Sequence, residues 1–475
     1  MRFAAIGIAT AVAYALWVVW LPLLPANLYV PLLDLGKITG YTWQAALTYL
    51  GFVIALHGLY ALGYRLVSKG VVPTLPVSVF GAVFAIELLG AYPATAVDVF
   101  GYIAHGRMLA DHHVNPFITP PNAFPTDAIL AYLAFPSEPS QYGPAWVLLD
   151  GALALAARGE LLGELILYKL VAAVAHLVGG LLVLGICRQL GARPSQARAG
   201  AFLFVWNPLL LWEMVGNAHN DGLMMVGGLL AVLLLLRRSY VVSLSALVAG
   251  ALVKVPVIVI GPLLLVTLAR RRLVAALEGV ALAMLLAFVV YRPFWDGPGT
   301  LTALRRTELF TASFGAVLRL GLEAPFGLPI ATDVARGASL TLFALVVALC
   351  IGLAVRAQTS SEIVTLAYAT MLAAMLLATT WFQAWYVVWP FAFAAALPDG
   401  RRHLEAALLS LGGWLQYFVF IYLWVIGVFP PYESFDLQVV AYAALVGPLV
   451  LGALAMRWPR WTRVSLSPKE MVDAN

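Results

Sequence analysis

Charged residues are scarce in this sequence. Asp, Glu, Lys and Arg together form 11% of the 475 residues, whereas hydrophobic residues form 63% and the mean hydropathy is +0.92. A soluble domain carries about 25% charged residues, which hydrate its surface. The composition therefore excludes a water-soluble globular protein and predicts an integral membrane protein that lipid solvates.

Cysteine is also scarce, because Cys187 and Cys350 are the two that occur. They are too few for a disulfide framework or a cysteine-based zinc site. We expect no soluble domain at either end, and no internal repeat is evident. The first apolar run, 3–24, is longer than a signal-peptide core and no clear small-residue cleavage site follows it, so we expect a retained helix.

The sequence is instead rich in apolar runs of roughly 15 to 25 residues, the length of a membrane-crossing helix. A helix is favoured in lipid because it satisfies its own backbone hydrogen bonds. The expected helices are 3–24, 43–64, 75–92, 163–187, 199–215, 223–236, 241–253, 256–268, 273–291, 338–355, 363–380, 385–397, 404–429 and 437–456. The short pair flanking Lys254 could form a re-entrant hairpin, so we predict about 12 to 14 transmembrane helices. The short run 145–157 is expected to be interfacial or re-entrant on the outer face.

Basic residues lie in short clusters between these runs. The clusters are Arg65/Lys69, Arg188/Arg193/Arg198, Arg237/Arg238, Arg270/Arg271/Arg272, Arg356, Arg401/Arg402 and Arg457/Arg460/Arg463. Such clusters mark the cytoplasmic side, which explains the net charge of +5 better than nucleic-acid binding does. The pattern predicts cytoplasmic termini and a plasma-membrane protein. It places two long loops, 93–144 and 292–337, on the outer face, where loops of this length are usually functional.

The first of these loops contains a candidate catalytic group. Asp98, Tyr102, His105 and His112 recur at spacings that place them on one face of a helix. A carboxylate that neighbouring polar groups orient could act as a general base toward a hydroxyl. The alternative is structural, because Asp98 could lie in the first turn of a helix that Thr95 caps. The spacing leaves both interpretations open.

Several cations could bind an anionic phosphate. Arg107 can make bidentate, charge-assisted contacts to phosphate. Lys254 interrupts an apolar stretch beside a proline, which is typical of a broken helix that lines a cavity. Both residues could instead extend toward lipid headgroups. Arg292, Arg305 and Arg306 lie in the second outer loop, against the positive-inside rule, which suggests a function.

Two further segments are unusual for membrane turns. The segment 206–225 carries Glu213, Asn217, His219, Asn220 and Asp221. An acid within an apolar helix, such as Glu213, is a functional candidate, although Asn and Asp are ordinary in tight turns. The segment 379–390 carries Gln383 and Trp385 among other aromatic residues. Its rings could form an interfacial aromatic belt or a platform for a sugar.

In this order, the motifs resemble one known family. The motifs are DVFGYIAHGR at 98–107, NPF at 115–117, QYGPAW at 141–146, WNPLLLWEMVGNAHND at 206–221, KVP at 254–256 and WFQAWYVVWP at 381–390. They are similar to motifs of the polyprenol-phosphate-mannose-dependent mannosyltransferases of the GT-C superfamily, of the lipomannan α-1,6-mannosyltransferase type. The resemblance covers about 75–398.

The resemblance implies a GT-C fold whose two outer loops carry short helices. It implies inverting transfer of a hexose, expected to be mannose, from a polyprenyl-phosphate-linked donor to a lipid or glycan acceptor on the outer face. Asp98 would be the general base. The leaving phosphate would be bound by Arg107, Lys254, Arg305, Arg306 and Arg292. The sugar and the acceptor would be bound by Tyr102, His105, His112, Asn115, Tyr142, Glu213, Asn217, His219, Asn220, Asp221, Gln383 and Trp385.

His105 departs from the family pattern, because relatives often carry an acid at this position. With one acid in this motif we expect no metal, and since the lipid-linked sugar is a substrate we expect no cofactor. We expect a catalytic membrane module at 1–398, C-terminal membrane helices at 399–463 and a short cytoplasmic tail at 464–475. The alternative function is a secondary transporter or lipid flippase, which repeated halves and charges near the membrane centre would favour.

Overall fold

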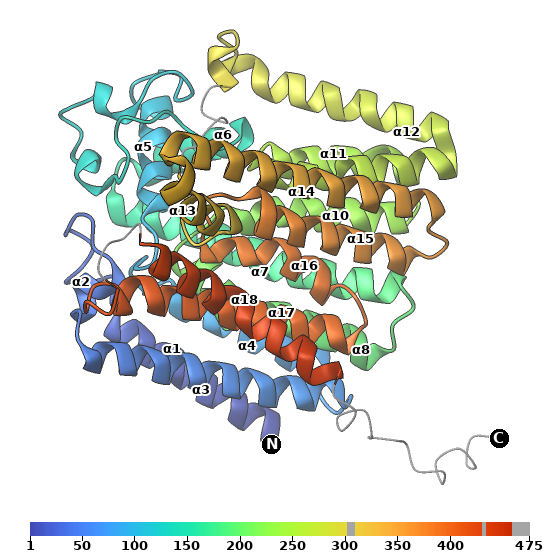
Figure 1. The fold of residues 1–475 in the computed structure, drawn as a ribbon, viewed down its shortest axis with the longest axis horizontal. Coiled ribbons are helices and arrows are strands. Elements are labelled where there is room, and N and C mark those ends of the chain that lie inside the picture. The colour runs from blue at the N-terminus through green and yellow to red at the C-terminus, as the bar shows by residue number, and fades with distance from the viewer. Residues whose placement is uncertain (302–308, 430–433, 458–475) are drawn as a thin grey trace.

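The computed structural model describes residues 1–301, 309–429 and 434–457. Within these ranges the chain forms helices and irregular segments and contains no β-strand. The helices lie side by side and run roughly parallel across Figure 1. The predicted all-α fold is confirmed.

Among the described residues, eight helical segments are long and apolar enough to cross a membrane. They are α1 (Arg2–Trp20), α3 (Trp43–Ser68), α7 (Leu161–Gln189), Val255–Phe294 around α12, α14 (Leu328–Arg356), Ser360–Ala378 around α15, Gly400–Leu423 around α17, and Phe435–Ala455 of α18. A bent pair, Pro194–Val205 (α8) with Pro208–Gly216 (α9 and η3), is bent by 42° and forms either a ninth, broken span or a re-entrant loop. The protein is an integral membrane protein.

Shorter apolar helices complete the bundle. They are α4 (Thr74–Leu88), α6 (Pro144–Ala157), α10 (Asp221–Leu236), α11 (Tyr240–Ala251) and Ala384–Ala395, which comprises η8 (Ala384–Val387) and α16 (Val388–Ala395). Within α12 (Gly261–Tyr291), Arg272 has non-helical backbone angles and separates two helices. These two arms correspond to the runs 256–268 and 273–291 that the sequence predicted as separate helices.

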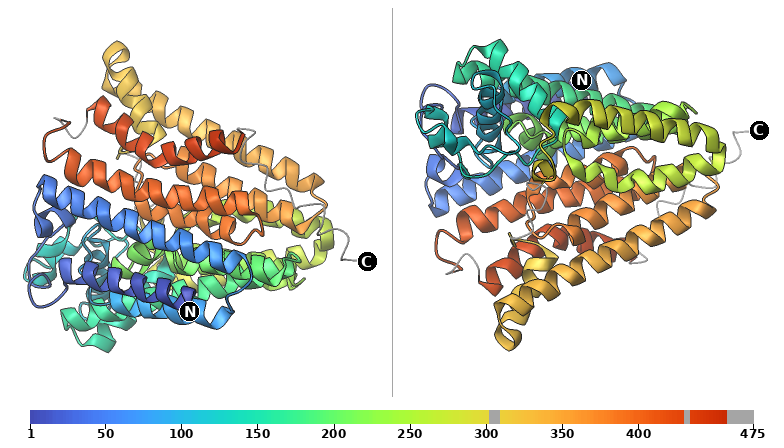
Figure 2. Two further views of the ribbon diagram at one scale, coloured as in Figure 1. Left: turned by 90° about the horizontal axis from the view of Figure 1, so that it is seen from below. Right: turned by 90° about the horizontal axis from the view of Figure 1, so that it is seen from above.

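One end of the bundle carries the irregular segment 92–143. It contains α5 (Asp98–Ala110), η1 (Pro121–Ala123) and η2 (Ala128–Tyr132). Figure 1 shows α5 near α2 (Leu35–Thr39) on the left, whereas the connection between α7 and α8 lies on the right. In both views of Figure 2 the segment again lies at one end of the bundle. We call this end the loop end.

Two predicted boundaries are wrong. The second loop was expected to extend to 337, but α14 begins at Leu328 with a proline in its first turn, which suits a helix start. The polar residues that follow Leu328 therefore lie on a helix. His112 was expected on the same helical face as Asp98, but α5 ends at Ala110 and His113 has a φ of 55°. His112 therefore lies beyond the helix, and the left-handed conformation of His113 prevents the helix from continuing past it.

A cluster of buried indole rings holds η3 (Leu211–Gly216), a π-helix, in the bundle. The ring of Trp17 lies 5.3 Å from that of Trp212 and 5.6 Å from that of Trp414, both edge to face. Such aromatic pairs contribute about 0.5 to 1.5 kcal/mol beyond their burial. The cluster joins α1, η3 and α17, and η3 carries Glu213 toward the loop end. Short π-helical segments such as η3 are frequent at functional sites.

Candidate active site

Asp98 is the first residue of α5, and its side chain is 29% exposed. Its Oδ2 accepts a hydrogen bond from the Tyr142 hydroxyl at 3.4 Å and lies 3.8 Å from Nδ1 of His219. The N-terminus of α5 also favours a negative charge at this position. The residue before the helix is Val97 and no side chain caps α5, so Asp98 lies in the first turn as in the structural alternative, but the cap by Thr95 is not formed. Asp98 thus has one hydrogen-bond donor, the Tyr142 hydroxyl, lies close to His219 and remains partly exposed.

Asp98 lines a cavity of about 380 Å³, which we call the Asp98 cavity. Four segments that are far apart in the sequence form its wall: 97–105, 121–142, 254–256 and 381–386. Five of the residues predicted from the motifs line it, namely Asp98, His105, Tyr142, Lys254 and Trp385. The fold therefore brings four of the sequence motifs and the segment 121–139 to one space at the loop end.

His219 lies behind Asp98 and is buried. Its Nε2 is 3.4 Å from Oε2 of Glu213, and its ring stacks on Trp385 with the ring centroids 4.0 Å apart. Glu213 in turn accepts hydrogen bonds from Asn217 at 2.9 Å and from the Thr95 hydroxyl at 3.3 Å. These groups place polar side chains next to one another from η3 to Asp98, although neither ring nitrogen of His219 has a hydrogen-bond partner among the described residues.

Lys254 lies on the wall of the cavity beside the rings of Tyr142 and Tyr386, at 5.8 and 5.4 Å from their centroids. Its ammonium group donates to Oδ2 of Asp221 at 2.7 Å. The other oxygen of Asp221 accepts from the Trp389 indole at 2.7 Å. A lysine has three N–H donors, so a ligand in the cavity can still accept from Lys254.

The other cations predicted for phosphate lie elsewhere. Arg107 donates to both carboxylate oxygens of Glu164, at 3.1 and 2.7 Å, and to Asp127 at 3.2 Å. Burial alone would lower the pKa of Arg107, but the bonds and charges of Glu164 and Asp127 raise it. The contacts join the end of α5 to α7 and η2, outside the lining of the Asp98 cavity.

Arg292 lines a separate, largely apolar cavity of about 540 Å³, between Phe288, Tyr291 and Trp295. Arg305 and Arg306 lie outside the described residues. Among the described residues that line the Asp98 cavity, Lys254 is thus the side chain with a permanent positive charge.

The remaining predicted residues support the cavity or lie apart from it. The ring of Tyr102 packs edge to face against that of Tyr142, with centroids 4.8 Å apart. Asn115 donates to the Phe294 carbonyl at 2.8 Å, and His112 stacks on Phe124, so both make contacts within the loop end. Asn220 is buried, and its amide has no hydrogen-bond partner among the described residues. Gln383 lines a different cavity, although Trp385 follows two positions later.

The Asp98 cavity is also lined by Glu138, Gln141, Trp381 and Tyr386, which were not among the predicted site residues. Glu138 is a second acid at this wall. In the sequence, Glu138 could have been recognised as an acid between two prolines, Pro136 and Pro139, in a long loop. No group of three His, Cys, Asp or Glu residues in the described part of the chain could hold a metal ion. Metal independence stays a prediction.

The fold and the cavity define a class, an all-helical membrane protein with an oriented carboxylate, a lysine and indole rings around one polar cavity. The model of the alpha-(1->6)-mannopyranosyltransferase family, N-terminal domain, matches residues 2–270, which is more than half of the chain. The chain belongs to this family of glycosyltransferases. The match includes Asp98, Tyr142 and Lys254, whereas Trp385 lies beyond it.

One curated relative is alpha-(1->6)-mannopyranosyltransferase A of Corynebacterium glutamicum. It is 24% identical over 172 residues, which are 36% of this chain and 34% of the relative. The aligned region thus spans about a third of the length of that relative. Both findings point to an α-1,6-mannosyltransferase and agree with the resemblance that the motifs indicated.

Proposed function

We propose that this protein transfers mannose from a polyprenyl-phosphate-linked donor to a hydroxyl of a glycan or glycolipid, with Asp98 as the general base. The observation that carries the proposal is the position of Asp98. Its carboxylate accepts a hydrogen bond from Tyr142, lies 3.8 Å from His219, remains 29% exposed and lines a cavity that also contains Lys254. Family membership makes mannose the expected sugar.

The reaction is a single displacement at the anomeric carbon. The proton of the acceptor hydroxyl moves to Asp98, while the acceptor oxygen forms a bond to the anomeric carbon. The bond from that carbon to the phosphate oxygen breaks, and the phosphate leaves with the electron pair. A single displacement inverts the configuration, so an α-linked product requires a β-linked donor.

Lys254 and the aromatic wall have complementary roles in this proposal. The ammonium group of Lys254 stabilises the charge that develops on the leaving phosphate. Asp221 holds Lys254 in place through the 2.7 Å contact. The rings of Trp385 and Tyr386 line the same cavity and offer apolar faces to a sugar ring. Each group would act on a different part of the donor.

We further propose that the loop end lies on the outer face of the membrane, with both termini in the cytoplasm. The distribution of basic clusters supports this orientation, because Arg188 and Arg193 flank the connection between α7 and α8 at the opposite end. A lipid-linked donor suits such a site, since its isoprenoid chain can stay in the bilayer while its phosphate reaches the loop end.

The test is transfer of labelled mannose from polyprenyl phosphate mannose to an oligomannoside by the purified protein. Asp98→Asn should lower the rate about 10³-fold, because it removes the base and keeps the shape. Asp111→Asn is the matched control, since Asp111 is an exposed acid that follows the other end of α5. The proposal fails if a folded Asp98→Asn protein transfers at the parental rate. Movement of the donor across vesicles without transfer would support the flippase instead.

A further inference from the structure

A second polar cavity lies on the other side of the segment that precedes Asp98. Its volume is about 240 Å³, and we call it the Gln416 cavity. Its wall comes from Asp34 and Tyr41, from 94–95, from Thr311, from 382–383 and from 416–425. Gln383, which the sequence suggested for the sugar or the acceptor, lines this cavity, whereas Asp98, Lys254, Trp385 and Tyr386 line the Asp98 cavity.

The lining of the Gln416 cavity suits an uncharged sugar. Aromatic side chains, including Tyr41, Tyr417 and Trp424, provide apolar faces, and the amides of Gln383 and Gln416 provide hydrogen-bonding groups. No basic residue is among the described side chains that line it. Its one acid, Asp34, accepts from the Tyr41 hydroxyl at 2.9 Å. The nearest cation, Lys37, pairs with Asp34 at 3.4 Å and does not line the cavity, so an anionic phosphate would meet an acid rather than a basic side chain on this wall.

Gln416 gives a second and independent indication of a ligand. The residue is 4% exposed, and its Oε1 is buried without a hydrogen-bond partner among the described residues. A buried polar atom without a partner is unfavourable, and native proteins rarely keep one. A hydroxyl of a bound molecule would satisfy an amide that lies on the wall of a polar cavity.

The Gln416 cavity and the Asp98 cavity share two walls. Ala94 and Thr95 line the Gln416 cavity, and Val97 and Asp98 line the Asp98 cavity. The turn 381–386 likewise contributes residues to both cavities. Thr95 is also connected to Asp98, because its hydroxyl donates to Glu213, which lies beside His219. A molecule in one cavity thus lies next to the segments that shape the other.

We propose that the Gln416 cavity is a neutral-carbohydrate subsite that holds an inner sugar of the acceptor glycan, away from the reacting end. The acceptor role of this subsite rests on the proposed function. The binding of a neutral sugar in the Gln416 cavity does not depend on it. The subsite would make the protein prefer oligosaccharide acceptors over a single sugar, because a single sugar cannot occupy both cavities.

The first experiment measures binding without catalysis. Linear oligomannosides of two to four units are titrated into the full-length Asp98→Asn protein in nanodiscs and followed by calorimetry. Gln383→Leu and Gln416→Leu, each combined with Asp98→Asn, should weaken binding about tenfold, the effect of losing one hydrogen bond to a sugar. Gln189→Leu is the matched control, since Gln189 is exposed at the end of α7. If the Gln416→Leu variant does not fold, the Gln383→Leu variant alone is used to test the inference.

The second experiment uses the active protein. Gln383→Leu should raise the KM for an oligomannoside about tenfold and leave the KM for a single mannoside and for the donor unchanged. The inference is overturned if both leucine variants bind oligomannoside as tightly as their parent, or if the KM values for short and long acceptors rise together. If Asp98→Asn still transfers mannose, the assignment of the base fails, yet the binding result stands and decides the inference separately.

Discussion

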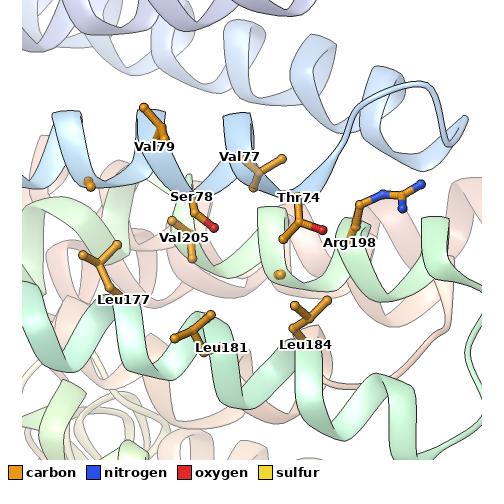
Figure 3. Close-up of a pocket in the computed structure, with 12 residues that line it drawn as sticks. Thr74, Val77, Ser78, Val79, Leu177, Leu181, Leu184, Arg198 and Val205 are labelled. Carbon is orange, nitrogen blue, oxygen red and sulfur yellow. The ribbon is translucent and has the colours of Figure 1, made fainter.

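The Asp98 cavity and a cavity between α4, α7 and α8 have similar sizes but different linings. The cavity between α4, α7 and α8 has a volume of about 280 Å³, compared with about 380 Å³ for the Asp98 cavity. Figure 3 shows Leu177, Leu181 and Leu184 of α7 facing the side of α4 that carries Val77, with Arg198 at one edge. Its lining is otherwise apolar apart from Thr74 and Ser78. We call it the α7 cavity.

The comparison teaches that the groups in a cavity, rather than its volume, indicate chemistry. The α7 cavity has no acid in its lining, and Arg198 donates to the Gly70 carbonyl at 3.2 Å. The Asp98 cavity has two acids and a lysine, from segments that come together only in the fold. Proton transfer and departure of a phosphate need such groups, whereas the α7 cavity offers apolar contact.

The largest difference between the cavities should appear when each loses its cation. Lys254→Met should lower the transfer rate about 10²-fold, because the leaving phosphate loses its electrostatic partner. Arg198→Met in the α7 cavity should change the rate less than about twofold. Single-turnover transfer with saturating donor measures both.

Lys254→Met also leaves the buried Asp221 without its ion pair, which could slow the reaction through misfolding. The double variant Lys254→Met/Asp221→Asn removes this unpaired charge. We expect the double variant to stay slow. Recovery of the parental rate would mean that Lys254 serves only to hold Asp221.

A second pair of variants fills each cavity without removing a polar group. Gly101 lies in α5 and lines the Asp98 cavity, and no atom lies within 4 Å of where its Cβ would be. Gly101→Leu should lower kcat/KM about tenfold, because the added side chain occupies space for the substrate. Ala82→Leu, in the lining of the α7 cavity, should leave kcat/KM close to that of the parent. Equal losses in the two variants would show that general packing, and not substrate space, is responsible.

Arg107 should separate stability from activity. Its side chain is 14% exposed and pairs with the fully buried Glu164. Arg107→Met leaves that carboxylate without a partner, which costs about 3 kcal/mol. We expect a clearly lower thermal unfolding temperature, with a transfer rate per folded molecule within about threefold of the parent. A large loss of kcat at unchanged stability would instead show that Arg107 binds the phosphate, as the sequence suggested.

The sequence predicted the helices and much of the Asp98 cavity for definite physical reasons. Apolar runs of membrane length are local features, so their positions could be predicted without tertiary structure. Asp98 stood out by its helical spacing with other polar residues, Lys254 because it interrupts an apolar stretch, and Tyr142 through the motif that resembles the family. The location of all three at one cavity required the motifs to lie at the same end of the bundle, which the positive-inside pattern indicated.

Contacts between distant segments could not be predicted in the same way. Arg107 looked like a phosphate ligand because Glu164, its partner, lies in another helix. Gln383 and Trp385 looked like one site, but η8 (Ala384–Val387) begins between them and directs them to different cavities. Glu138 lies in an irregular loop, where no periodicity shows which way a side chain points.

The smallest effect on transfer is expected from His105, which lines the Asp98 cavity and is buried. Burial lowers the pKa of His105 to about 4. Its unfolded pKa is about 6.5, so the folded protein gains stability from neutral His105 above that pH. This stability is lost as the pH falls from 6.5 to 4, since the unfolded chain takes up the proton first.

The non-titrating variant His105→Gln should therefore lose less stability than the parent between pH 7 and pH 5, by about 2 kcal/mol. The midpoint of thermal unfolding at each pH measures this difference. The rate profiles of the two proteins between pH 6 and pH 8 should run parallel, because His105 stays neutral throughout that range. A step in the parental profile that the variant lacks would show instead that His105 exchanges a proton during transfer.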